Sequence, residues 1–484
     1  MGNIADSILV PGVFVTIDNS LANTASGEAF KTVIFGQKTS AGTATAEVLT
    51  QVFSAEQAAE LSGNGSLLDE MFRGWFATNN VSEVYMVALE DAGAATAGTQ
   101  TLTVAVTTAE AGTLSLYVNG KLLRIGVTAA QTDAQIATAI AAAITADVTL
   151  PITAVAASEV VTCTAKNKGT LGNDIDLRFN EGSTEAFPTG VTVAVAVGVT
   201  GATDPDIADA IAALPDEVFK VIVNPYTDSA STTALKTELD RRWGATVQLD
   251  GHALMATAGT ASTVATFGDT LNSEHFTFTD AGKDVMAPPY TWAATLAGRV
   301  SFSADADPAR PFRTLGLSGI VGDDATDRRT FSELNAILSS GIGTHKVLND
   351  GSVVVDRLVT TFKTNSVGAA DTSYQNTNTM FNLSYMRQSY KTRMLSRYPR
   401  HKLADDGDVF GGGQPIATPS TVKGEIIALY REWILDGLAE DLDSFAESLV
   451  VERDVTNRSK LNVNMQPKLI GQLYQFDANL QFIV

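Results

Sequence analysis

Apolar and polar residues alternate along the last eleven residues of the chain. The apolar positions are Tyr474, Phe476, Ala478, Leu480, Phe482 and Val484. Glutamine, aspartate and asparagine stand between them as far as Gln481. This period of two predicts a half-buried β-strand, about 35 Å long at roughly 3.3 Å per residue. Two interpretations are open: the strand closes a sheet of its own chain, or it is an arm that adds a strand to a neighbouring subunit.

A second alternating segment lies near the start of the chain. Val13, Val15 and Ile17 recur at every second position after a Pro-Gly turn signal. The flanking residues are small and polar, as in a segment that only its partners hold in place. We therefore predict an N-terminal strand arm over residues 1–24.

Strand and helix patterns alternate in two separate parts of the chain. Residues 30–90 predict a strand, two helices and a strand, and the second helix carries apolar residues at spacings of three and four. Residues 203–325 resume with repeated strand and helix patterns. Such alternation is typical of a layered α/β sheet. The sequence therefore predicts one discontinuous α/β core, formed by residues 25–91 and 203–325.

The stretch between these two parts, residues 92–202, differs in composition. It is rich in threonine and alanine, and an Asn-Gly pair at positions 119 and 120 predicts a β-hairpin. A short alanine-rich helix is expected over residues 132–146. We therefore predict an inserted, mainly-β domain, and we expect it to face outward because insertions are tolerated at exposed surfaces.

Residues 326–460 predict a C-terminal α+β domain, followed by a C-terminal strand arm over residues 461–484. Amphipathic patterns predict a helix over residues 380–398 and one long helix over residues 422–449. The polar side of the long helix is acidic, at Glu432, Asp436, Glu440, Asp441 and Asp443. The other helix belongs to a basic run that includes Arg387, Lys391, Arg397 and Arg400. Each charged face is either solvated or a docking surface for another protein.

Composition and net charge argue against several classes of function. The 484 residues carry a net charge of −21, which argues against general nucleic-acid binding because phosphate contacts need a basic face. No apolar run approaches the ~18 residues of a membrane span, and the start lacks a signal-peptide pattern, so we expect a protein that is kept in a cytoplasm or leaves it without Sec export. The single cysteine, Cys163, excludes an intramolecular disulfide and a cysteine-based zinc site.

Candidate chemistry is sparse along the sequence. The four histidines lack ligand spacing, and no GxSxG elbow or GxGxxG turn follows a predicted strand. The glycine run at 411–413 lacks the Lys-Ser/Thr pair of a phosphate-binding loop. We therefore expect no catalytic residue, cofactor or metal. From the residues alone, an α/β enzyme with a β insertion and a surface adhesin stay open as interpretations.

Residues 288–321 carry an ordered set of motifs. They read Pro-Pro-Tyr-Thr-Trp-Ala-Ala-Thr-Leu-Ala-Gly-Arg from Pro288, Asp-Ala-Asp-Pro-Ala-Arg-Pro from Asp305 and Leu-Gly-Leu-Ser-Gly-Ile from Leu315. Together with the Pro-Gly-Val opening at Pro11, this order resembles the tail sheath proteins of contractile bacteriophages, in particular the Mu-like group. The resemblance covers most of the chain outside the insert.

The resemblance implies a role in assembly and contraction. Sheath subunits of this family stack as hexameric rings around an inner tail tube protein, and their terminal arms add strands to sheets of neighbouring subunits. Contraction, triggered at the baseplate, drives the tube through the host envelope. The implied partners are further copies of the chain, the tube, the baseplate and the tail terminator, without nucleic acid or direct membrane insertion. The implied location is the virion tail, after assembly in the host cytoplasm, and a phage-derived injection device is the alternative setting.

Under this resemblance, the acidic residues of the long helix are candidates for docking to the tube. The basic residues are candidates for contacts between subunits, and the alternating positions of the two arms are candidates for strand exchange.

Overall fold

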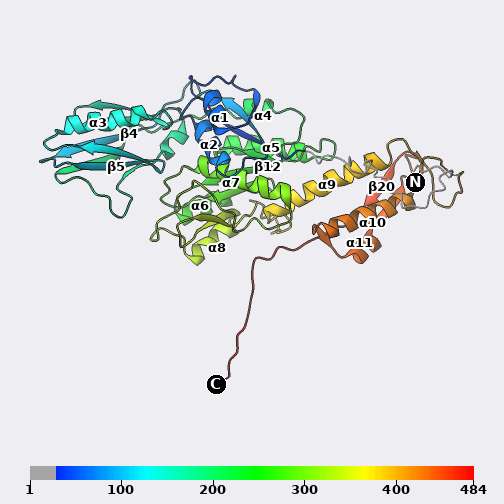
Figure 1. Cartoon of the computed structure of the whole chain (residues 1–484). Helices are drawn as coiled ribbons and strands as arrows, with labels where there is room; N and C mark the ends of the chain where they lie inside the picture. Colours follow the sequence, from blue (N-terminus) through cyan, green and yellow to red (C-terminus); the bar gives the residue numbers. More distant parts are fainter. Residues whose placement is uncertain (1–28, 412, 484) are drawn as a thin grey trace, which may run out of the picture.

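The computed structural model describes residues 29–411 and 413–483. The molecule is elongated, with the insert at one end, the α/β core in the middle and the C-terminal region at the other end (Figure 1). The candidate residues of the N-terminal arm, Val13, Val15 and Ile17, lie outside the described residues, as does Val484.

The core is built on one eight-stranded sheet. Its strands, in spatial order, are β15 (Val353–Arg357), β14 (Ile342–Val347), β13 (Phe276–Asp280), β12 (His252–Thr257), β11 (Val221–Val223), β1 (Lys31–Gln37), β3 (Glu83–Leu89) and β2 (Leu49–Val52). The six strands from β14 to β3 run parallel, and the strand at each edge is antiparallel to its neighbour. Because parallel strands are covered on both faces, their side chains are mostly buried, and the polar ones among them, such as Thr32 and Thr277, are buried as well.

Helices cover the sheet (Figure 1). In chain order they are α1 (Ala55–Ser62), α2 (Leu67–Phe76), α4 (Ala208–Ala212), α5 (Ser229–Trp243), α6 (Ala261–Asp269), α7 (Pro289–Ala306) and α8 (Phe331–Ser339). The sheet contains β1 and β3, which precede the insert, and β11 to β13, which follow it. The predicted fold class, a mixed α/β architecture with several domains and sheets, is confirmed.

Helix α7 explains the motif that begins at Pro288. Pro289 stands in its first turn, where a missing N–H costs nothing, and Trp292 and Leu296 recur on one fully buried face. A Cβ at Gly298 would lie 2.4 Å from Thr78 Oγ1 and 2.8 Å from the Trp75 carbonyl oxygen. Glycine is therefore needed at this position because α7 approaches the end of α2 so closely.

The core extends further along the chain than the sequence predicts. Strands β14 and β15 form a hairpin around Asp350 and Gly351, and β14 pairs with β13. The predicted boundary at residue 325 therefore cuts through the central sheet. The pattern did not show this because a hairpin that ends one sheet has the same local signature as a hairpin that begins another.

The insert forms two antiparallel sheets with one helix between its strands in sequence. The four-stranded sheet has the order β10 (Val191–Val197), β4 (Thr99–Val106), β8 (Val160–Ala165), β7 (Ile152–Ala157), and the three-stranded sheet has the order β6 (Lys121–Val127), β5 (Gly112–Val118), β9 (Leu177–Phe179). Helix α3 (Asp133–Ala146) packs Ile136, Ile140 and Ile144 against both sheets. A bridge between Thr96 and Ala202 brings the two ends of the insert side by side at the core.

The C-terminal region surrounds a smaller core. Its helices are α9 (Thr377–Arg397), α10 (Pro419–Leu435) and α11 (Leu442–Ser448), and its strand pairs are β16 (Lys402–Leu403) with β17 (Ile416–Ala417), β18 (Ala439–Glu440) with β21 (Lys468–Leu469) and β19 (Val450–Arg453) with β20 (Leu461–Asn464). Tyr430 and Phe445 stack with ring centres 3.7 Å apart, and Trp433 donates from Nε1 to Ser389 Oγ at 2.9 Å. These contacts join α10 to α11 and to α9.

The single helix predicted over residues 422–449 is wrong. Helix α10 ends at Leu435, and Gly437 adopts a φ of +72°, which stops a helix and favours glycine. The chain then forms β18 and starts again as α11, where an oxygen of Asp441 accepts a hydrogen bond from the Ser444 N–H. The apolar spacing continues across the break because both helices pack on the same core.

Within the part of the chain that the structure describes, no helix is long and apolar enough to cross a membrane.

Candidate assembly interface

The segment after β21 leaves the body of the molecule. Figure 1 shows it as a single extended trace that runs away from the core, and it contains no strand over residues 470–483. Its large apolar side chains are almost bare: Phe476 is 85%, Leu480 91%, Phe482 82% and Ile483 100% exposed. The interpretation that this segment closes a sheet of its own chain is therefore wrong for the single chain. An apolar strand with unpaired edges is suited to pairing with another chain.

Two arginines of the core hold the root of this arm. The guanidinium of Arg357 lies 4.6 Å from the centre of the Tyr474 ring, and Arg313 Nη1 donates to the Tyr474 carbonyl oxygen at 3.1 Å. Burial raises the pKa of the Tyr474 hydroxyl, and the two arginines act in the opposite direction. The arm therefore starts from a fixed point at the edge of the central sheet. No local pattern signals this contact, because the arginines stand more than a hundred residues before the tyrosine.

The hairpin β19–β20 offers strand edges in the C-terminal region. Its two strands pair only with each other among the described residues. Val450 is 48% exposed, and Val451, Leu461 and Val463 are half-buried against the C-terminal core. The hairpin thus combines free backbone edges with an apolar face, which is what an added strand needs.

The acidic residues are distributed over three elements instead of one helix. Glu432 pairs with Arg393 of α9, while the carboxylates of Glu440 and Asp441 lie 3.1 and 3.7 Å from Lys468 Nζ. Asp436, at the end of α10, and Asp443, in the first turn of α11, are exposed. Three of the five predicted docking residues thus have partners inside the chain.

The four basic candidate residues also differ in their surroundings. Arg387 points to the core, where Nη1 lies 2.6 Å from the buried Asp250 carboxylate and the guanidinium lies 3.9 Å from the Trp243 ring centre. Arg397 lies 3.3 Å from Glu425 of α10, whereas Lys391 and Arg400 are exposed. The structure therefore does not bring these four residues together on one face.

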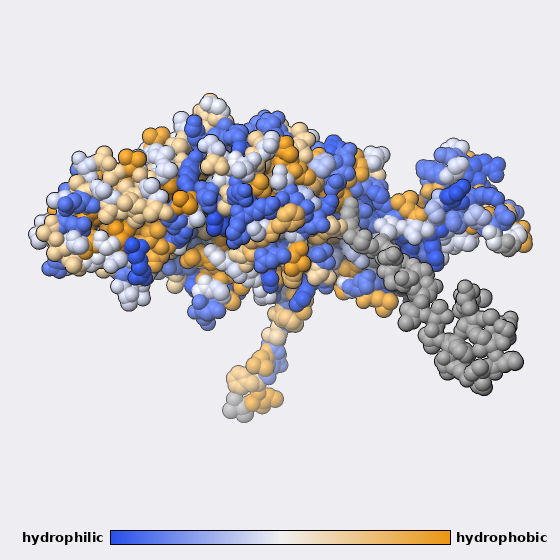
Figure 2. Space-filling view, turned by 45° about the horizontal axis from the view of Figure 1, so that its top comes forward, coloured by the Kyte–Doolittle hydropathy of each residue, from blue (hydrophilic) through white to orange (hydrophobic). Residues whose placement is uncertain are grey.

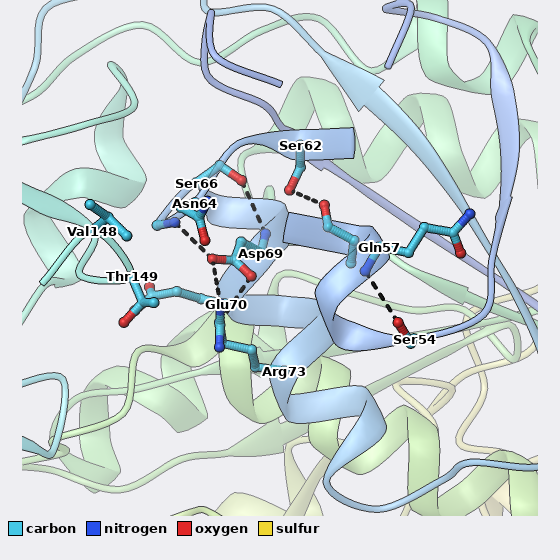
Figure 3. Close-up of polar contacts among 12 residues, drawn as sticks. Ser54, Gln57, Ser62, Asn64, Ser66, Asp69, Glu70, Arg73, Val148 and Thr149 are labelled. Carbon is cyan, nitrogen blue, oxygen red and sulfur yellow. Dashed lines mark hydrogen bonds and ion pairs between the residues drawn. The ribbon is translucent and has the colours of Figure 1, made fainter. Parts of the chain in front are cut away.

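A buried polar cluster joins the insert to the core, and Figure 3 shows Asp69, Glu70 and Arg73 on the core side of this cluster. The side chain of Asp69 is fully buried and accepts hydrogen bonds from the Gly65 N–H at 2.7 Å and from Arg73 Nη2 at 3.1 Å. Next to it, Glu70 accepts from Tyr290 Oη at 2.7 Å and from Asn119 Nδ2 of the insert at 3.1 Å. Burial raises the pKa of the Glu70 carboxyl to about 7, while the hydrogen bonds from Tyr290 and Asn119 lower it.

Asn167 provides a second tie between insert and core. Its Oδ1 accepts from the Leu67 N–H at 2.9 Å, and its Nδ2 donates to the Lys38 carbonyl at 2.9 Å and to Asp91 Oδ1 at 3.1 Å. In addition, Arg178 lies 3.0 Å from the Asp284 carboxylate. With contacts from three separate parts of the insert, the domain is fixed in one orientation on the core.

Metal chemistry has little support in the described part of the chain. No group of three or more histidine, cysteine or acidic side chains there is placed to hold an ion. Burial raises the pKa of the Cys163 thiol to about 12, so this residue stays protonated and unreactive.

Known proteins resemble this chain along its whole length. A family model for the central domain of phage tail sheath proteins matches residues 200–361, and one for the phage tail sheath C-terminal domain matches residues 369–483. The Mu-like prophage FluMu tail sheath protein of Haemophilus influenzae is 35% identical over 483 residues, which cover 100% of this chain and 99% of that protein. The chain belongs to the phage tail sheath family. The predicted family is thereby confirmed, and the protein is a contractile tail sheath component.

A solved structure supports this fold. A chain from the contracted baseplate of the anti-feeding prophage superposes with a TM-score of 0.51 at 10% identity, covering 99% of this sheath protein and 98% of that chain. A sheath tail protein from Listeria innocua gives a TM-score of 0.48 at 16% identity, covering 93% and 94% of the two chains. The C-terminal family model ends at residue 483, so the exposed arm is part of the sheath domain itself.

Proposed function

We propose that this sheath protein assembles as hexameric rings stacked around an inner tail tube, and that contraction of the stack drives the tube through a host envelope. The observation that supports the assembly step is the bare apolar arm beyond Tyr474. Four exposed large apolar side chains do not stabilise a single chain in water, whereas each contact in a polymer would bury them.

In this proposal the C-terminal arm of one subunit adds a strand to a neighbour by pairing of backbones. The edges of the β19–β20 hairpin are the acceptor. The alternation of the arm suits this role because Phe476, Leu480 and Phe482 would face the apolar side of the hairpin while the glutamines face water. Val13, Val15 and Ile17 of the N-terminal arm would complete the same sheet.

Truncation of the arm after Tyr474 tests the proposal. Removal of residues 475–484 keeps the contact with Arg357, and the described residues among them, 475–483, are all exposed, so the truncated chain is expected to fold as before and to stay monomeric. Electron microscopy and sedimentation of the full and truncated chains, with thermal unfolding as the control, give the answer. Tubes formed by the truncated chain would exclude strand exchange by the C-terminal arm.

Docking to the tube is a separate proposal and rests on the acidic side of the C-terminal region. Asp436 and Asp443 carry it, because their exposed carboxylates are available to a partner, while Glu432, Glu440 and Asp441 contribute through a shared negative field. Single surface pairs are worth only about 0–1 kcal/mol, but a sheath repeats them in every ring. Replacement of Asp436 and Asp443 by lysine should lower the fraction of sheaths that contain a tube. Equal occupancy would show that this face is only solvated.

The exposed Lys391 and Arg400 are proposed to contact an acidic surface of the neighbouring subunit, while Arg387 positions α9 against the core and the exposed Arg397 pairs with Glu425 of α10. We further propose that assembly takes place in the host cytoplasm and that the finished sheath is bounded by a baseplate and a tail terminator. A phage-derived injection device would use the same contacts, and particles that contain packaged DNA would distinguish a phage tail from such a device.

A further inference from the structure

The two outer strands of the four-stranded sheet in the insert lack the usual protection of free strand edges. β10 lies at one edge and β7 at the other. No charged residue occurs from position 148 to 158 or from 186 to 203, although the whole chain has a charge of −21. Edges of monomeric sheets normally carry charged side chains, bulges or a cover, because an uncharged edge pairs with other chains.

Side chains at the end of β10 are exposed on the face that is buried elsewhere in the sheet. Val195 is 40% and Val197 76% exposed, yet Val195 stands directly opposite the fully buried Leu102 of β4. Helix α3 packs mainly against the other three strands of this sheet, β4, β8 and β7. Figure 2 shows apolar residues gathered over this end of the molecule. Val195 and Val197 are therefore exposed at the edge of the sheet that β10 forms.

Strand direction selects the partner for these edges. β10 is antiparallel to β4, β4 to β8 and β8 to β7, so β10 and β7 run in opposite directions. When a second insert in the same orientation is placed beside the first, its β10 lies antiparallel to the first β7. Pairing of two copies of β10 would require a twofold axis, whereas subunits of a sheath that point the same way are related by rotation and translation.

We propose that the insert is a second contact between copies of this chain, in which β10 of one insert pairs with β7 of the next. The ties at Asn167, Asn119 and Arg178 fix the insert on the core, so every insert of a regular polymer has the same orientation. The neighbour's α3 lies over its own β7, beside the newly joined β10, and would cover Val195 and Val197. In such a head-to-tail contact each insert pairs its β10 with one neighbour and its β7 with the other, so the contact can repeat along the polymer.

Cysteine pairs test this contact directly, and the test rests on the polymer described under the proposed function. Val155 of β7 and Ala194 of β10 both point to the face opposite α3 and are exposed. The first double variant is V155C/A194C. Two further variants, V155C/T192C and V155C/A196C, cover other registers of the paired strands. Each variant is oxidised in two samples: tubes of the full chain, and a concentrated solution of the chain truncated after Tyr474. Within one chain the two positions stand at opposite edges of a four-stranded sheet, about 14 Å apart at roughly 4.8 Å per strand, so an intramolecular disulfide cannot form.

The expected result is a ladder of covalent multimers from at least one double variant in a non-reducing gel, and no product beyond background from either single variant. The matched control is V155C/T103C, because Thr103 lies opposite Ala194 on the same face but one strand further inside the sheet. No ladder in tubes or in solution would overturn the proposal, and dimers from A194C alone would replace it with a twofold contact. Tubes without a ladder refute this inference alone, whereas a failure to form tubes refutes the proposed function and leaves the solution sample to decide on the insert.

Discussion

The alternating arm predicts a large effect of a single side chain on assembly and none on folding. Phe476 is 85% exposed in the single chain, so Phe476→Ala removes almost no intramolecular contact. If a neighbour buries this ring, the loss is about 1.5–3 kcal/mol per contact. Because about 1.4 kcal/mol corresponds to a factor of ten, the critical concentration for tube formation should rise roughly tenfold to hundredfold.

The assay is pelleting of tubes over a series of protein concentrations, with the unfolding temperature measured on the same samples. Phe331→Ala is the matched control, since this ring is 87% exposed on the body of the molecule. Gln475→Ala probes the polar side of the same arm and should change the critical concentration far less. A critical concentration of Phe476→Ala equal to that of Phe331→Ala would refute the reasoning, and so would a fall in its unfolding temperature.

Three further predictions concern stability. Glu70→Gln should remove a pH dependence of stability: burial raises the pKa of the Glu70 carboxyl to about 7 in the folded chain, so the native chain loses stability as the pH rises from about 4.5 through about 7, by at most about 3 kcal/mol. Denaturant titrations of both proteins at pH 5 and pH 8 would disprove this if the two stabilities change equally with pH. Asp280→Ala should lower the free energy of unfolding by about 3–5 kcal/mol, because the buried Arg329 guanidinium loses the carboxylate that lies 2.9 Å away. A double variant with Arg329→Met should recover part of this loss. Trp433→Ala should cost about 3–5 kcal/mol and lower the protease resistance of the C-terminal region, which a Leu435→Ala control on the exposed side of α10 should not do.

Local patterns in the sequence were sufficient for most individual elements. The helix expected over residues 380–398 corresponds to α9, and the Asn-Gly pair at 119 and 120 is the turn between β5 and β6. Such features depend on spacing and turn chemistry within a few residues, and these act in the same way in the free segment and in the fold.

The errors have two causes: a local signal that was outweighed, and pairings between distant segments. The break in the predicted long helix depends on Gly437 and on the cap at Asp441, and both signals were present but were outweighed by the continuing apolar stripe. The assignment of β14 and β15 to the central sheet depends on pairing with β13, which local periodicity does not contain. The ion pairs of Arg387 and Glu432 likewise join residues from different elements, so neither charged face could be judged before the fold was known.

Helix α9 belongs to two hydrophobic cores at once. Phe381, near its start, packs in the central core against Phe30 and Phe312, and Met386 and Tyr390 further along pack in the C-terminal core. Its 21 residues form one continuous helix about 31 Å long at roughly 1.5 Å per residue. Bending α9 would break backbone hydrogen bonds, so this helix is a stiff connection between the central core and the C-terminal core. Movement of the central region is therefore transmitted to the C-terminal region through α9, and under the proposed strand exchange the compliance needed during contraction would lie in the arms.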